Sequence, residues 1–221
     1  IYMKNNTTLY HFIVDQSGSM TGMEQQAIEG FNTQLEKIQD LEKTMPDQKF
    51  LCSLTFFNSE IQDVLKNEAV KQIELLSNNN YRPGGMTALL DAVGGSIDRI
   101  EKQFGKELEN DEISIVMVII TDGYENASKY FTYHMVAQKI AKLDETGKWT
   151  FSYLGADFDA IHTSKMMNIR KENVMNFRKK SYASMMDDLS DSIGVYAEEK
   201  RKGNLKRDIL DIFKKKDRRN D

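Results

Sequence analysis

The fold is decided by the stretch Leu9-Tyr10-His11-Phe12-Ile13-Val14-Asp15-Gln16-Ser17-Gly18-Ser19. Its first six residues are mainly branched or aromatic, and a polar turn containing glycine follows at once, which is typical of a buried strand. After the turn, apolar residues recur at the spacing of a helix, at Ala27, Ile28, Phe31, Leu35 and Ile38. A strand, turn and helix in this order predict an α/β sheet, in which ligands bind beyond the carboxyl ends of the strands.

The same alternation of strands and helices continues along the chain. Strands are expected at 9–14, 50–57, 61–65, 113–120, 150–154 and 173–177, and helices around 27–38, 89–100, 133–143, 160–167 and 183–199. Three residues separate the second and third strands, which is too few for a parallel crossover, so the third strand should be an antiparallel edge. The run 113–120 is apolar on both faces and should be central. The predicted fold is a doubly wound, mostly parallel α/β sheet of six strands, with helices on both faces.

Length and charge predict one domain with a basic extension. The 221 residues, 40% hydrophobic and 29% charged, can bury one large core, which we assign to residues 1–200. Residues 200–221 hold ten Lys or Arg and four Asp, although the whole chain has a net charge of −4. We therefore expect 201–221 to be a basic tail or helix that docks on this domain or on a partner, and we do not expect a nucleic-acid partner.

The expected location is the cytoplasm. No apolar stretch approaches the roughly 20 residues that span a bilayer, and no charged-then-apolar leader opens the sequence. Cys52 is the single cysteine, so it cannot form an intrachain disulfide and should be core filler. A protein exported by another route, or a fragment of a longer chain, would share these features.

Hydroxyl and carboxylate side chains gather just after two of the expected strands. Asp15, Ser17 and Ser19 follow the first strand, Asp122 follows the central one, and Thr87 comes from a loop with Gly84 and Gly85. These groups are hard oxygen donors, which suit Mg²⁺, Mn²⁺ or Ca²⁺ and select poorly for Zn²⁺ or Cu²⁺. The glycines would let the Thr87 loop approach the others closely. The pattern predicts that the strand 9–14 lies beside the strand 113–120, with a divalent-metal site between their carboxyl ends.

At these positions the sequence resembles the von Willebrand factor type A (VWA) or integrin I-like domains. Their metal-ion-dependent adhesion site has an Asp-x-Ser-x-Ser loop, a Thr on a later loop and an Asp after the fourth strand, and the matching residues here are Asp15, Ser17, Ser19, Thr87 and Asp122. The stretches 85–92, 121–128 and 155–157 also resemble stand-alone bacterial and phage VWA proteins. The resemblance covers roughly residues 8–200. It implies that Mg²⁺ at this site binds an Asp or Glu of a protein partner, and that the chain is not an enzyme.

Two other functions stay open. In phosphatases that form an aspartyl-phosphate, Asp15 would be the nucleophile, but the general acid two residues later is here Ser17, which cannot donate a proton at neutral pH. No Walker A loop, dinucleotide fingerprint, nucleophile elbow or His-Glu-x-x-His helix occurs. The alternatives are a metal-dependent hydrolase or phosphatase that lacks these motifs, and a scaffold subunit in which the metal is structural.

The remaining polar residues carry weaker signals. Asp91 and Asp157 are left out of the metal-ligand set, and a helix cap is favoured for Asp157. For Glu125 and Asn126, a role in supporting the site or contacting a partner competes about evenly with a place in a solvated loop. The histidines at 11, 134 and 162 lack ligand spacing and should be packing or surface residues. The methionine pairs at 166–167 and 185–186 should fill the core.

Overall fold

The computed structural model describes residues 6–156 and 160–203, and these form a single six-stranded sheet. The strands are β1 (Thr7–Asp15), β2 (Lys49–Phe57), β3 (Ile61–Ala69), β4 (Ile113–Thr121), β5 (Trp149–Ala156) and β6 (Val174–Phe177), in the order β3-β2-β1-β4-β5-β6. All neighbours pair in parallel except β2 and β3, which are antiparallel. The predicted fold class, the edge strand and the pairing of the first strand with 113–120 are therefore confirmed.

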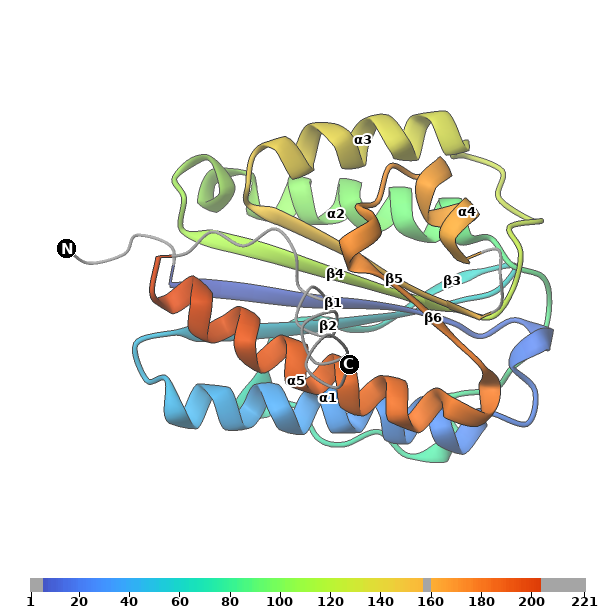
Figure 1. The fold of residues 1–221 in the computed structure, drawn as a ribbon, viewed down its shortest axis with the longest axis horizontal. Coiled ribbons are helices and arrows are strands. Elements are labelled where there is room, and N and C mark those ends of the chain that lie inside the picture. Colours follow the sequence, from blue (N-terminus) through green and yellow to red (C-terminus); the bar gives the residue numbers. More distant parts are fainter. Residues whose placement is uncertain (1–5, 157–159, 204–221) are drawn as a thin grey trace, which may run out of the picture.

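Helices cover both faces of the sheet (Figure 1). The helices α1 (Glu24–Thr44) and α5 (Tyr182–Arg201) lie on one face, and α2 (Leu89–Glu109), α3 (Tyr133–Glu145) and the short α4 (Ala160–Met166) lie on the other. No helix among the described residues is long and apolar enough to cross a membrane. The segment 204–221, which contains most of the predicted basic tail, lies outside the described residues.

The central strand β4 supplies both hydrophobic cores. Val116, Val118 and Ile120 belong to the core under α1 and α5, while the alternating residues Ile115, Met117 and Ile119 belong to the core under α2 and α3. All nine residues of β4 are buried. An unbroken apolar run is the pattern expected of a parallel strand covered on both faces, and this burial explains why the run predicted a central position.

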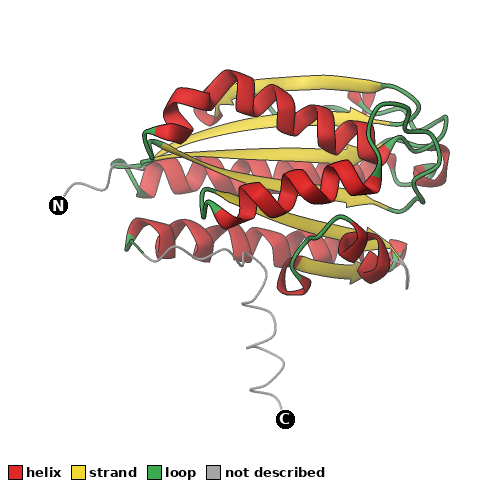
Figure 2. Ribbon diagram, turned by 90° about the horizontal axis from the view of Figure 1, so that it is seen from above, coloured by secondary structure: helices red, strands yellow, loops and turns green. Residues whose placement is uncertain are grey.

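Several element ends differ from the sequence-based expectation. The third strand continues past 65 to Ala69, and the last helix begins at Tyr182 and ends at Arg201. Residues 66–68 are polar, as expected of an edge strand that is exposed on one side. Because they lack an apolar pattern, the sequence did not indicate that the strand continues. Figure 2 shows loops gathered at the end to which the parallel strands point. The predicted metal ligands lie at this end, with Asp15 as the last residue of β1 and Ser19 in a short 3-10 turn after it.

Candidate metal centre

The loop after β1 is folded around the carboxylate of Asp15. This residue ends the strand, and its Oδ1 accepts a hydrogen bond from the backbone N–H of Ser17 at 2.7 Å. The hydroxyl oxygens of Ser17 and Ser19 lie 3.0 Å apart. The hydroxyl of the buried Tyr81 donates to the backbone carbonyl of Asp15. The short loop thus directs one carboxylate and two hydroxyls to the same end of the sheet.

Asp122 reaches the same place because β4 pairs directly with β1. It follows the last residue of β4, Thr121, whose hydroxyl donates to Asp15 Oδ2 at 2.5 Å. The Ser19 hydroxyl donates to Asp122 Oδ1 at 2.6 Å. These two hydrogen bonds join residues more than 100 positions apart in the sequence and close the crevice between the two strands.

Backbone hydrogen bonds dock the glycine loop against this crevice. The Gly84 N–H donates to the Gln16 carbonyl at 2.9 Å, and the Gly18 N–H donates to the Gly85 carbonyl at 3.0 Å. Gly85 has φ +76°, a conformation that favours glycine. Thr87, two residues later, is buried, and Asn126 holds it by accepting its N–H and donating to its carbonyl. Asn126 therefore supports the site, the first of the two interpretations left open by the sequence.

Three of the predicted ligands converge on one point beside Gly123. An ideal Cβ built on Gly123 would lie 2.8 Å from Thr87 Oγ1, 3.2 Å from Asp15 Oδ2 and 3.3 Å from Ser19 Oγ. Hydrogen bonds of 3.0 Å or less link Asp15, Ser17, Ser19 and Asp122, and Thr87 joins them by facing the same point beside Gly123. Glycine keeps this oxygen-lined point open, and the donors are of the type that a hard divalent cation takes.

Lys179 places a cation in the candidate site that the sequence did not predict. The ammonium of Lys179 lies 2.6 Å from Asp122 Oδ2 and also donates to the backbone carbonyl of Ser19. The Asp122 side chain is fully buried, whereas that of Lys179 is 49% exposed. The signal in the sequence was the basic run Arg178-Lys179-Lys180 directly after the last strand, 160 residues from Ser19.

The site concentrates negative charge in a buried position. Burial is the largest cause that raises the pKa of Asp15, and the neighbouring charge of Asp122 adds to it. Hydrogen bonds from Thr121 and Ser17 act in the opposite direction and stabilise the ionised form. A cation placed between the two carboxylates would offset both the burial and the mutual repulsion.

Two further acidic residues near the site hold loops. Asp91 accepts the backbone N–H groups of Lys129, Tyr130 and Phe131 at 2.7–2.9 Å. Glu125 likewise accepts backbone N–H groups, from 90, 127 and 128. Both carboxylates fix the segment after β4 against the start of α2, which agrees with leaving Asp91 out of the ligand set. Asp157 lies outside the described residues.

The remaining predicted roles are mostly confirmed. Cys52, Met185 and Met186 are buried in the core under α1 and α5, and Met167 is buried in the other core. Met166 is 41% exposed, so this residue is not core filler as expected. His11 is buried, and His134 and His162 are exposed. The described residues contain no cluster of three or more His, Cys, Asp or Glu side chains suited to a metal, so the hydroxyl-rich set carries the metal hypothesis.

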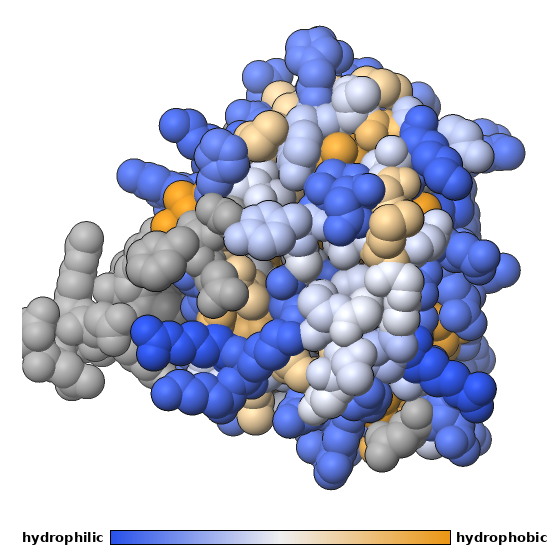
Figure 3. Space-filling view, turned by 90° about the vertical axis from the view of Figure 1, so that its right-hand side faces the viewer, coloured by the Kyte–Doolittle hydropathy of each residue, from blue (hydrophilic) through white to orange (hydrophobic). Residues whose placement is uncertain are grey.

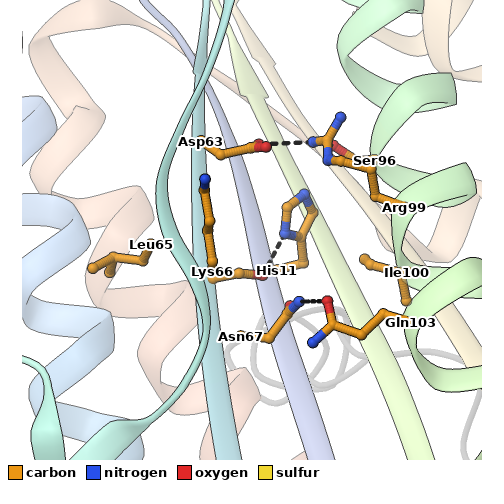
Figure 4. Close-up of a pocket in the computed structure, with 10 residues that line it drawn as sticks. His11, Asp63, Leu65, Lys66, Asn67, Ser96, Arg99, Ile100 and Gln103 are labelled. Carbon is orange, nitrogen blue, oxygen red and sulfur yellow. Dashed lines mark hydrogen bonds and ion pairs between the residues drawn. The ribbon is translucent and has the colours of Figure 1, made fainter.

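A cavity of about 210 Å³ lies between β3 and α2, and none of the predicted metal ligands lines it (Figure 4). Two bridges span it: Arg99 pairs with Asp63 at 2.8 Å, and Asn67 donates to Gln103 at 2.7 Å. The His11 ring lies between them, with Nδ1 2.5 Å from the Ser53 hydroxyl. Burial, together with the charge of Arg99, lowers the pKa of His11 to about 3, so the ring stays neutral at physiological pH.

Comparison with solved structures identifies the architecture. A von Willebrand factor type A protein from Catenulispora acidiphila matches at a TM-score of 0.56 and 13% identity, over 85% of this chain and 42% of that one. Proximal thread matrix protein 1 from the mussel byssus, with a zinc-occupied MIDAS motif, matches at 0.54 and 14%, over 86% and 46%. Manganese-loaded Plasmodium vivax TRAP protein matches at 0.54 and 15%, over 82% and 72%.

The chain therefore has the fold of VWA domains. It spans less than half the length of the Catenulispora and mussel proteins. No protein-family model matches the sequence, and no curated protein matches it either.

Proposed function

We propose that this chain is a metal-dependent protein-binding module. The observation that carries the proposal is the convergence of Thr87, Asp15 and Ser19 on the point left open by Gly123. Asp15, Ser17, Ser19, Thr87 and Asp122 would hold the ion, and Mg²⁺ suits this oxygen set, with Mn²⁺ or Ca²⁺ as alternatives. Two proteins of the same fold, the mussel and Plasmodium proteins, are described as zinc-occupied and manganese-loaded, which supports a divalent metal here.

The proposed partner is a protein that offers an Asp or Glu side chain. A hard cation bound mainly by neutral hydroxyls supplies an open position that favours an anionic oxygen. The surrounding face is predominantly hydrophilic (Figure 3), and Met86 and Tyr124, one and two positions from the proposed ligands, are 56% and 64% exposed. These two side chains offer apolar contact beside a directional metal bond, a combination suited to a specific protein interface.

We further propose that the chain is not an enzyme. Ser17 stands where an aspartyl-phosphate enzyme needs its general acid, and its hydroxyl contacts Ser19 within the loop. His11 lines the cavity between β3 and α2, and none of the five proposed metal ligands lines that cavity. Metal-dependent turnover of a phosphomonoester such as p-nitrophenyl phosphate by the purified protein, lost in Asp15→Ala, would contradict this part of the proposal.

Thermal unfolding tests the metal site. Millimolar Mg²⁺ or Mn²⁺ should raise the melting temperature relative to EDTA, because an ion at 100 times its dissociation constant stabilises the folded state by about 2.7 kcal/mol. At this size that corresponds to roughly 5–10 °C. Asp15→Ala should abolish the shift, while Asp40→Ala, at an exposed carboxylate on α1, should retain it. Melts that do not respond in the wild type or in Lys179→Met, which lacks the ammonium beside Asp122, with calorimetric titration also showing no binding in either, would refute the site.

Partner capture tests the second half of the proposal. Binding of a partner isolated with the wild-type protein in Mg²⁺ should be lost in EDTA and weakened in Thr87→Ala, which removes one hydroxyl and neither carboxylate. A structural metal would instead let Thr87→Ala lose stability and partner binding together. Capture that persists undiminished in EDTA would rule out the metal-mediated mechanism.

A further inference from the structure

The Lys179 ammonium contacts two of the residues that are proposed to hold the ion. It lies 2.6 Å from Asp122 Oδ2 and donates to the Ser19 carbonyl, so it contacts two elements of the predicted ligand set at once. Lys179 opens the 3-10 turn Lys179–Ser181 between β6 and α5, and neither element supplies a predicted ligand. Lys179 therefore reaches the site from a part of the chain that carries no predicted ligand.

The burial of Asp122 explains why such a cation is needed. Its side chain is fully buried, Oδ1 accepts the Ser19 hydroxyl, and Oδ2 forms the ion pair with Lys179 at 2.6 Å. A buried carboxylate oxygen without a donor is costly, and the negative charge of Asp15 next to it raises that cost. The ammonium of Lys179 supplies a compensating charge to Asp122 Oδ2.

A divalent ion at the same ligands changes this balance. The ion would bring two positive charges to Asp122, the carboxylate with which Lys179 pairs. The two charges of the ion and the charge of the Lys179 ammonium would then lie within one small crevice. Like charges at such short separation repel strongly in a partly buried site. Lys179 is 49% exposed and sits at the start of a surface turn, so its side chain can leave towards solvent.

We propose that Lys179 is a tethered cation that occupies the metal site of the free protein and must be displaced when a divalent ion binds. This inference rests on the proposed metal site and concerns its regulation. Lys179 thereby keeps the metal-free site folded and weakens the apparent affinity for the metal. Binding of the ion is an exchange of one cation for another, and the binding-competent site is exposed only after the exchange.

The test compares Lys179→Met with Lys180→Met. Both substitutions keep an unbranched side chain and remove one charge. Lys180 is the next residue in the same turn and is also exposed, but the ion pair with Asp122 is made by Lys179. In calorimetric titration with Mg²⁺ or Mn²⁺, Lys179→Met should bind at least about tenfold more tightly than the wild type. In EDTA its melting temperature should fall by about 2–4 °C, because Asp122 loses its counter-charge. Lys180→Met should show neither change.

Amine labelling provides an independent readout on the unmodified chain. With an N-hydroxysuccinimide ester and peptide mass spectrometry, labelling of Lys179 should rise severalfold when Mg²⁺ replaces EDTA, because metal binding frees its ammonium. Labelling of Lys180 in the same sample should not change. A metal-dependent rise at Lys179 alone supports the exchange.

The outcomes separate this inference from the proposed function. If wild type and Lys179→Met bind the metal with equal affinity, the site exists and the exchange is refuted. If neither binds Mg²⁺ or Mn²⁺, the metal site itself is refuted and the exchange with it. Tighter binding by Lys179→Met, including the case in which the wild type binds too weakly to measure, supports both.

Discussion

Gly123 is the single residue on which the space for a cation depends. A Cβ at this position would lie 2.8 Å from Thr87 Oγ1, closer than real Cβ contacts, so Thr87 or the Gly123 backbone would have to move. Gly123→Ala should therefore lose most of the Mg²⁺-induced rise in melting temperature, while overpacking lowers the metal-free stability by about 1–3 kcal/mol. Thermal melts with Mg²⁺ and with EDTA measure both effects.

The matched control is Gly84→Ala in the loop that contacts Gln16. A Cβ there would meet no atom within 4 Å, and the Gly84 N–H would still donate to the Gln16 carbonyl. This variant should keep the full metal response. A Gly123→Ala protein that responds to Mg²⁺ as strongly as the wild type would show that the ion does not occupy the point beside Gly123.

The sequence predicted the candidate site residues that form a motif, but it did not predict the residues that reach the site only because the fold brings them there. Asp15, Ser17, Ser19, Thr87 and Asp122 have a fixed spacing relative to expected strand ends, and the structure brings all five together. Thr121 and Lys179 have no such pattern. A threonine at the end of an apolar strand and a lysine in a basic run are both common in proteins and indicate no particular role. The role of Thr121 follows only from the pairing of β1 with β4, and that of Lys179 only from the turn after β6.

At the scale of elements, the first turns of α2 fix the segment that follows β4. Asp91 holds the backbone of 129–131, and three residues later Gly94 lies against the ring of Phe131. A Cβ at Gly94 would lie 2.3 Å from that ring, so Gly94→Ala should destabilise the fold by about 1–3 kcal/mol through overpacking. Urea unfolding followed by circular dichroism would measure the loss.

The neighbouring residue Gly95 is the control on the same helix. A Cβ there would meet only the end of the flexible Arg99 side chain at 3.3 Å. Because glycine costs up to about 1 kcal/mol in a helix interior relative to alanine, Gly95→Ala should be neutral or stabilising. If the two variants had equal stability, the packing of α2 against the ring of Phe131 would not contribute as described.

Element order was easier to predict than element ends, for a physical reason. Alternating strands and helices with short connections leave few arrangements of the sheet, and the apolar run of β4 identifies its centre. The end of β3 depends on backbone pairing instead: Glu68 and Ala69 pair with Cys52 and Leu51 although the residues before them are polar, and Asn67 has φ +56°. Irregular pairing at an edge leaves no hydrophobic period in the sequence.

Across the whole molecule, the two ends of the sheet are held by different means. At the carboxyl end of the strands, loops are joined by hydrogen bonds around the candidate metal site (Figure 2). At the opposite end, near the start of β1, Lys200 in the last turn of α5 donates to the Thr7 carbonyl at 2.9 Å and to the Thr8 hydroxyl at 2.5 Å. Neither acceptor carries a charge, and within residues 6–156 and 160–203 the buried ammonium of Lys200 pairs with no carboxylate.

This burial makes global stability depend on pH in the alkaline range. Burial lowers the pKa of Lys200 from 10.5 to about 7. Above pH 7 the folded protein releases this proton, while the unfolded chain keeps it up to about pH 10.5, so the unfolded state binds more protons. The contribution of Lys200 to stability therefore rises with pH between these values, by at most about 1.4 kcal/mol per pH unit, and is constant below pH 7.

Lys200→Met isolates this contribution, because it keeps the aliphatic stem and removes the titrating group. Free energies of unfolding from urea titrations at pH 7, 8 and 9 should rise more steeply in the wild type than in Lys200→Met, with a difference on the order of 2 kcal/mol accumulated over this range. Lys202→Met, at a lysine that is 61% exposed, should follow the wild-type profile and exclude a general effect of net charge. Parallel profiles for wild type and Lys200→Met would mean that Lys200 remains protonated in the folded protein throughout, and that hydrogen bonds to Thr7 and Thr8 compensate fully for its burial at this end of the sheet.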